Sequence, residues 1–127
     1  MDYILLYSFG IILIFSIIGY GFLFSKIINK ELLSYNLGYQ GLLGIFFLTI
    51  ISYTTIFFTK HGYVHNLLLH LIGLVSFFYF FNKSRSFFEI KRLIFIFSIL
   101  FIGILILVNH DDFSYYHLTY SLGLTED

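Results

Sequence analysis

The sequence is 127 residues long, 59% hydrophobic and only 11% charged, with seven Lys/Arg balanced by seven Asp/Glu. An average soluble domain is about 25% charged, and a 15.0 kDa globule exposes too much surface to hide such an excess of apolar side chains. Composition therefore argues against a soluble domain and for a protein surrounded by membrane lipid. The zero net charge, with no basic run longer than a pair, argues against a nucleic-acid partner. Cysteine is absent, which excludes disulfides, thiolate metal sites and cysteine nucleophiles.

Four stretches of the chain are long enough to span a membrane. The first, 4–24, and the second, 37–58, contain no charged residue, and about 20 such residues cross a hydrocarbon core of about 30 Å. The third, 64–81, contains two histidines, and the fourth, 90–108, has its cations next to its start, where they can reach the headgroups. These runs are apolar on every side, which favours helices over barrel strands. We expect an all-α integral membrane protein with four transmembrane helices in a single domain, 1–127, whose short loops make successive spans antiparallel hairpins.

The distribution of basic residues predicts the orientation of these spans, because Lys and Arg are enriched on the cytoplasmic side. The second connection has Lys60 alone, and the tail 109–127 has no Lys or Arg. The other six basic residues lie in the first and third connections or in the ends of the spans next to them: Lys26, Lys30, Lys83, Arg85, Lys91 and Arg92. We therefore expect both termini to be extracytoplasmic.

Two groups of residues within or near the spans invite a functional reading. Gly38, Gly41 and Gly44 recur every three residues, a pattern that serves either close helix packing or entry of a ligand, and packing is the commoner use. The histidines could hold a haem or metal between helices or lie at the membrane interface: His61, His65, His70, His110 and His117. The spacing of the first three does not converge on one helix face, so we predict no metal or haem. The spans also lack the intramembrane carboxylate expected of a proton-coupled small multidrug exporter.

The tail 109–127 carries the sharpest chemical signal. Asp111 and Asp112 follow directly on the fourth span, at the predicted outer membrane surface. Either carboxylate could cap a following helix. That helix would have an apolar stripe of Phe113, Tyr116 and the residues one and two turns further on, so it would lie flat on the membrane interface. We therefore expect a short C-terminal interfacial helix.

Asp112, Tyr116, His117 and Leu118 form an Asp-x-x-x-Tyr-His-Leu pattern behind a transmembrane span. This segment resembles the GT-C class of polytopic membrane glycosyltransferases, in particular its bacterial members, whose pattern continues with Pro where this chain has Thr119. The resemblance covers about the last fifth of the chain, and here the acidic loop follows the fourth span rather than the first. It implies a bacterial inner-membrane enzyme that uses a polyprenyl-phosphate sugar.

The resemblance also implies a role for each matched residue. Asp112 would be the general base that activates an acceptor hydroxyl for inverting sugar transfer, with Asp111 beside it or orienting a divalent cation. Tyr116 and His117 would position the lipid phosphate or the sugar. No other cofactor is implied. The competing reading gives the two aspartates no chemistry and leaves them as helix caps that keep the tail outside.

Four spans are fewer than a GT-C enzyme needs to build its lipid cleft and acceptor groove. We therefore expect this chain to be an N-terminal part of a longer transferase that is inactive alone. The alternative is a small, self-contained four-helix membrane protein without catalysis, similar in size and span number to the GtrA-like proteins that assist translocation of lipid-linked sugars.

Overall fold

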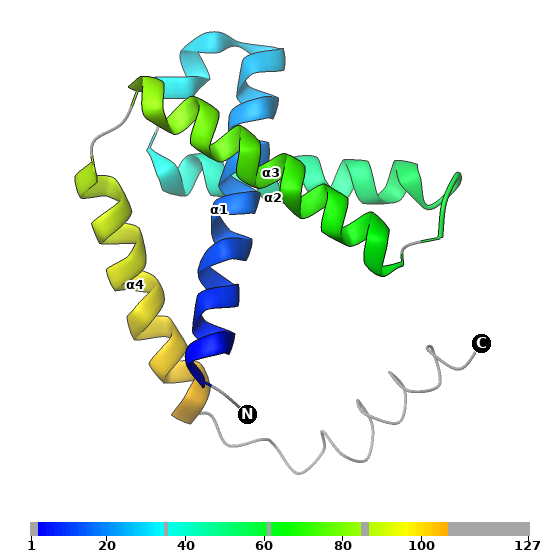
Figure 1. Cartoon of the computed structure of the whole chain (residues 1–127). Helices are drawn as coiled ribbons and strands as arrows, with labels where there is room; N and C mark the ends of the chain where they lie inside the picture. The colour runs from blue at the N-terminus through cyan, green and yellow to red at the C-terminus, as the bar shows by residue number, and fades with distance from the viewer. Residues whose placement is uncertain (1–2, 35, 61, 85–86, 107–127) are drawn as a thin grey trace. The chain divides into compact units, whose positions relative to one another are not determined.

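The protein is all-helical over the part of the chain that the computed structural model describes, residues 3–34, 36–60, 62–84 and 87–106 (Figure 1). The elements in chain order are α1 (Tyr3–Ile28), the short 3₁₀ helix η1 (Lys30–Ser34), α2 (Leu37–Thr55), α3 (Tyr63–Ser84) and α4 (Phe87–Ile106). The chain divides into two compact units, residues 1–97 and 98–127, and α4 crosses the boundary between them. The predicted all-α fold is confirmed.

Hydrogen bonds of two asparagine side chains define the connection between the end of α1 and the start of α2. After α1, the Asn29 side chain accepts a hydrogen bond from the Glu31 backbone N–H at 2.9 Å and starts η1. Asn36 then caps α2, since its extended backbone lets its Oδ1 accept from the Tyr39 N–H at 2.9 Å. The predicted start of the second span at residue 37 is thus set by the Asn36 cap.

Three of the described helices are long and apolar enough to cross a membrane: Tyr3–Ile28, Leu37–Thr55 and Tyr63–Phe81. The fourth helix, α4, is not among them, because three charged residues, Glu89, Lys91 and Arg92, occupy its first two turns. The structure therefore confirms the four predicted helices and the spanning length and composition of three of them. The interfacial helix predicted within 109–127 lies outside the described residues.

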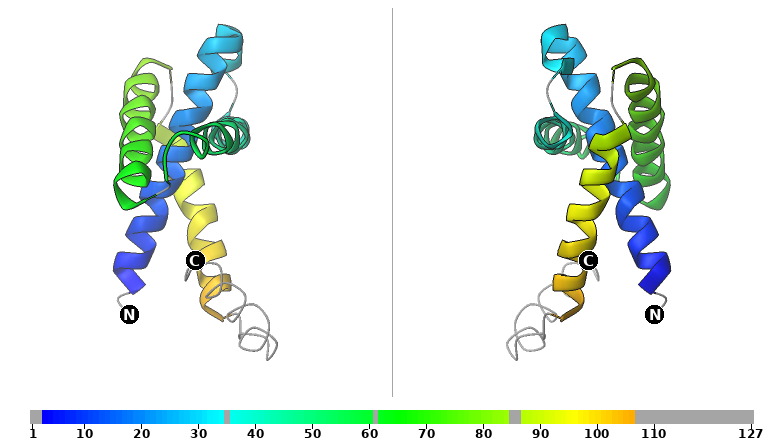
Figure 2. Two further views of the ribbon diagram at one scale, coloured as in Figure 1. Left: turned by 90° about the vertical axis from the view of Figure 1, so that its right-hand side faces the viewer. Right: turned by 90° about the vertical axis from the view of Figure 1, so that its left-hand side faces the viewer.

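Within the first unit, α1 is the helix against which both α2 and α3 pack. Gly19 faces the backbone of Gly73 in α3, whereas Gly21 faces the backbone of Gln40 in α2. Residues two apart on a helix point in nearly opposite directions, at about 100° per residue. Accordingly α2 and α3 lie on opposite sides of α1 (Figure 2).

The predicted antiparallel hairpin between the first two spans is wrong. Figures 1 and 2 show α2 running across α1 rather than alongside it. The reason lies in where the two helices meet: Gly44 abuts the Ile17 carbonyl in the middle of α1, and Gly21 abuts Gln40. Close backbone approach at one crossing point replaces a seam along the whole length of the helices.

A small apolar core surrounds these crossings, and most other large apolar side chains are exposed. The core consists of Ile18, Phe22, Leu37 and Phe77, each at most 4% exposed. Phe15 stacks on Phe77 with ring centroids 4.7 Å apart. An exposed apolar surface of this extent is expected where lipid, rather than water, surrounds the helices.

Candidate functional site

The four residues predicted to form a transferase site, Asp111, Asp112, Tyr116 and His117, lie outside the described residues. The structure describes the helix that leads toward them, α4, as far as Ile106. Their catalytic and substrate-binding roles therefore stay predictions.

The best-defined polar contact inside the apolar helices joins α1 to α3. The Ser16 hydroxyl, which is fully buried, donates to the His70 carbonyl at 3.2 Å and also lies 3.2 Å from His70 Nδ1. A hydroxyl has a single hydrogen, so both bonds coexist only when Nδ1 carries a proton and donates to the serine oxygen. The geometry thus favours a His70 ring that has a proton on Nδ1.

The same helix pair is joined once more, one turn along α1. The Tyr20 hydroxyl donates to the Leu69 carbonyl at 2.7 Å, while its ring lies within the buried part of the fold. Leu69 and His70 are adjacent, so α1 binds two consecutive carbonyls of α3 through Ser16 and Tyr20. These carbonyls gain a second hydrogen bond in addition to those of the helix, which suits polar side chains in an apolar medium.

A second buried polar group joins α1 to α2 and η1. The Ser25 hydroxyl donates to Gln40 Oε1 at 2.8 Å, and Gln40 Nε2 donates to the Leu32 carbonyl at 2.5 Å. Ser25 and Gln40 are both fully buried. Because an unsatisfied buried amide is costly, this arrangement fixes the start of α2 against the end of α1.

Neither of the two described histidines belongs to a metal cluster. His65 Nε2 lies 3.4 Å from Thr55 Oγ1, across the connection between α2 and α3, and His70 contacts Ser16. Within the described part of the chain, no three His, Cys, Asp or Glu side chains gather closely enough to hold a metal ion. The other three histidines lie outside that part, and the expectation of no metal site stays a prediction.

The three equally spaced glycines of α2 do different things. A Cβ on Gly44 would collide with the backbone of α1, so this glycine serves helix packing. Among the described residues, a Cβ on Gly41 would meet only Ile18 Cγ1, at 3.9 Å, and one on Gly38 only Asn36 Oδ1, at 3.4 Å. Packing explains Gly44, and it does not explain Gly38 or Gly41.

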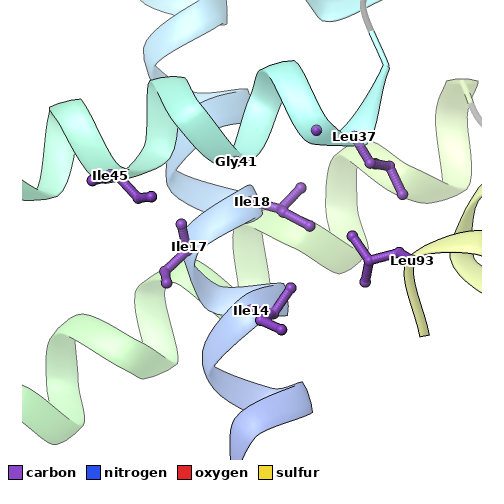
Figure 3. A pocket seen from close by; sticks show the side chains of 8 residues that line it. Ile14, Ile17, Ile18, Leu37, Gly41, Ile45 and Leu93 are labelled. Carbon is purple, nitrogen blue, oxygen red and sulfur yellow. The ribbon is translucent and has the colours of Figure 1, made fainter. Parts of the chain in front are cut away.

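Gly38 and Gly41 line an open apolar pocket of about 180 Å³ in the first unit. Figure 3 shows side chains of α1, α2 and the start of α4 around it. The lining residues are aliphatic apart from the two glycines: Ile14, Ile17, Ile18, Leu37, Gly38, Gly41, Ile45 and Leu93. A lining of this kind binds hydrocarbon and offers no group for acid–base or nucleophilic chemistry.

Reasoning from the sequence missed the buried contacts of Ser16, Ser25 and Gln40. Their position in the sequence could have revealed these contacts, since each is a polar side chain within a long apolar run. It also missed the pocket, which the spacing of Gly38 and Gly41 hinted at. No protein family, curated protein or solved structure was found to match this chain.

Proposed function

We propose that this chain is a multi-pass protein of a bacterial plasma membrane in which α4 provides a fourth span and both termini are extracytoplasmic. The cations of α4 stand at its start, with Lys91 Nζ 5.5 Å from the centre of the Phe87 ring and Arg92 Cζ 5.2 Å from that of Phe88. Cations and aromatic rings together are typical of a membrane interface. From residue 93 to Ile106 the helix has no charged residue, which supports its insertion from that point onward.

Reporter fusions test this orientation. Alkaline phosphatase fused after Asp127 is expected to be active, and a fluorescent protein fused at the same place is expected to be dark. Fusions in the connection around Lys30 should give the opposite pattern, because its basic residues keep it in the cytoplasm. A dark phosphatase and a bright fluorescent protein at residue 127 would contradict the proposal and remove the acidic tail from the extracytoplasmic side.

We further propose that the segment after α4 contributes the general base of a GT-C-like inverting transferase that uses a polyprenyl-phosphate sugar. The observation that carries this proposal is the Asp-x-x-x-Tyr-His-Leu pattern, Asp112 with Tyr116 and His117, immediately behind an apolar helix. A carboxylate there could accept the proton of an acceptor hydroxyl while the hydroxyl oxygen bonds to the anomeric carbon and the lipid phosphate leaves from the opposite side of that carbon. The same reaction would give inversion in a single displacement.

Asp112→Asn tests the assignment in the longer protein that carries this segment. Loss of a general base costs about 10²–10⁴ in rate, whereas Asn caps a helix about as well as Asp, so the two readings of Asp112 predict different outcomes. Asp111→Asn is the matched control, since Asp111 is one position out of register with Tyr116 and His117. Equal and negligible effects of the two substitutions in an active enzyme would contradict the catalytic role.

The second candidate is a small, self-contained membrane protein without catalysis, comparable to the GtrA-like proteins. The observation in its favour is that α1, α2 and α3 hold one another through glycine contacts and buried hydrogen bonds within the first unit. Reading the gene beyond codon 127 separates the candidates. Further apolar spans downstream would support the transferase, and a stop codon would support the self-contained protein.

A further inference from the structure

The chain leaves the helix α2 while its sequence is still apolar. The helix ends at Thr55, and the next three residues, Ile56, Phe57 and Phe58, form a turn, here called the turn 56–58. The backbone N–H groups of Phe58 and Thr59 both donate to the Thr55 carbonyl, at 3.0 and 2.9 Å. The apolar run therefore continues past the point where regular helical hydrogen bonding stops.

The backbone at the end of α2 needs hydrogen-bond donors from outside the protein. No described residue donates to the carbonyls of Tyr53 and Thr54, which belong to the last turn of the helix. A carbonyl without a partner is costly in hydrocarbon, where no water can donate to it. These two carbonyls therefore argue that the end of α2 lies within reach of water.

The side chains at the same place argue against water alone. Phe57 and Phe58 are each 82% exposed, and two exposed tyrosines, Tyr53 and Tyr63, lie on either side of the turn along the chain. Figure 1 shows the connection between α2 and α3 well to one side of α1, the helix around which the core is built. Large apolar rings that protrude in this way are unfavourable in bulk water and mark a surface that binds lipid or protein.

Polar groups accompany these rings in the connection. Thr55 Oγ1 lies 3.4 Å from His65 Nε2 and so joins the last residue of α2 to the first turn of α3. The Thr59 hydroxyl donates to the Thr55 carbonyl at 3.3 Å, and Lys60 is exposed. Tyrosine at the headgroup level, phenylalanine below it and a lysine that can extend to the headgroups are together typical of a membrane interface.

We propose that the turn 56–58 inserts into the headgroup layer of the membrane and that Phe57 and Phe58 anchor it there in contact with lipid. This layer supplies both water for the free carbonyls and apolar surface for the rings, at a depth of about 5–10 Å. The turn also continues the lipid-facing surface of α2, which includes the exposed Leu42 and Phe46. The proposal rests on the proposed membrane insertion and goes beyond it, since it places a connection in the membrane rather than in water.

Tryptophan fluorescence tests the position of the turn, because the chain contains no tryptophan and each single substitution reports one site. Phe57→Trp and Phe58→Trp are made in the full chain and reconstituted in phosphatidylcholine vesicles. We expect emission shifted to the blue of free tryptophan. Lipid brominated near the top of its acyl chains should quench this emission more than lipid brominated near the chain ends.

Val75→Trp is the matched control, at a residue near the middle of α3 that is 69% exposed. Lipid brominated near the chain ends should quench it most. If it behaves so while both turn variants emit like free tryptophan and ignore brominated lipid, the turn lies in water and the proposal is overturned. Blue-shifted emission of the turn variants without quenching by brominated lipid would identify a second copy of the chain as the cover and would also overturn it. A Val75→Trp variant that brominated lipid does not quench would instead contradict the membrane insertion itself.

Anchoring is tested by removing the two rings. In a Tyr63→Trp background, the double substitution Phe57→Ser with Phe58→Ser should increase quenching by acrylamide, a water-soluble quencher, because the connection moves outward. The control pair Ile27→Ser with Ile28→Ser removes two exposed apolar side chains from the end of α1 and should leave this quenching unchanged. Equal quenching with and without the two phenylalanines would overturn their role as anchors.

Discussion

The crossing of α1 and α3 at Gly19 makes a stability prediction that the structure allows us to quantify. Gly19→Ala adds one methyl group directly against the carbonyl of Gly73 and the backbone nitrogen of Phe77. Backbone atoms cannot rotate aside as a flexible side chain does, so the two helices must separate. Separation would also stretch the hydrogen bonds of Ser16 and Tyr20 to α3, which flank this crossing.

The expected loss follows from two opposing terms. Overpacking of a close contact costs about 1–3 kcal/mol. The replacement of glycine by alanine in a helix returns about 1 kcal/mol. Gly103→Ala has the same helical term without the clash, because no described atom lies within 4 Å of its Cβ. The difference between Gly19→Ala and Gly103→Ala therefore isolates the clash, and we expect about 1–3 kcal/mol, or about 5–150-fold in the unfolding equilibrium constant.

Unfolding in mixed micelles of mild detergent and sodium dodecyl sulfate, followed by circular dichroism, measures this difference. Both variants and the wild type are titrated under the same lipid and detergent conditions, since bound lipid shifts apparent stability. Gly19→Ala should unfold at a clearly lower fraction of sodium dodecyl sulfate than Gly103→Ala. Equal stability of the two variants would refute the close backbone contact between α1 and α3.

Two further predictions concern the buried hydrogen bonds. Gln40→Leu removes the amide that binds the Leu32 carbonyl and the Ser25 hydroxyl, and it should lower the free energy of unfolding by about 1–3 kcal/mol. The double substitution of Gln40→Leu with Ser25→Ala should cost less than the sum of the two single substitutions. Strict additivity in the same titration would contradict the contact. Ser16→Ala should lower the free energy of unfolding by about 0.6 to 1.7 kcal/mol. It should also remove the contact that favours a proton on His70 Nδ1. Identical ¹⁵N chemical shifts of the His70 ring in wild type and variant would argue against the hydrogen bond.

The sequence was informative about the helices because their apolar runs are long and their ends are marked locally. Asn36 caps α2 next to the predicted start at 37, and α3 begins at Tyr63, one residue before the predicted 64. The end of α2 was placed too late, at 58 rather than Thr55, because Ile56, Phe57 and Phe58 continue the apolar pattern after the helix has ended. Hydropathy reports burial in lipid, and it does not report where backbone hydrogen bonding stops.

The helix contacts could not be predicted in the same way, because they depend on which turn of each helix lies at a crossing. Gly38, Gly41 and Gly44 have equal spacing in the sequence, yet only Gly44 lies at the point where α2 meets Ile17 of α1. The pairing of Ser25 with Gln40 is equally invisible to periodicity, because it depends on the path of η1 between the two helices. The predicted transferase residues stand apart from both cases, since their pattern lies beyond Ile106.

The uses of the polar residues within the apolar helices bear on where chemistry should be sought. Lipid gives helices no hydrophobic reason to associate, so close backbone approach and hydrogen bonds must hold them together. On one side of α1, Ser16 and Tyr20 bind α3, and on the other Ser25 binds Gln40 of α2. These side chains already have structural partners, and replacing any of them should affect stability first. Under the proposed transferase function, chemistry is therefore better sought outside the middle of the spans. Among the described residues the acidic ones, Glu31 and Glu89, lie in the first turns of their helices.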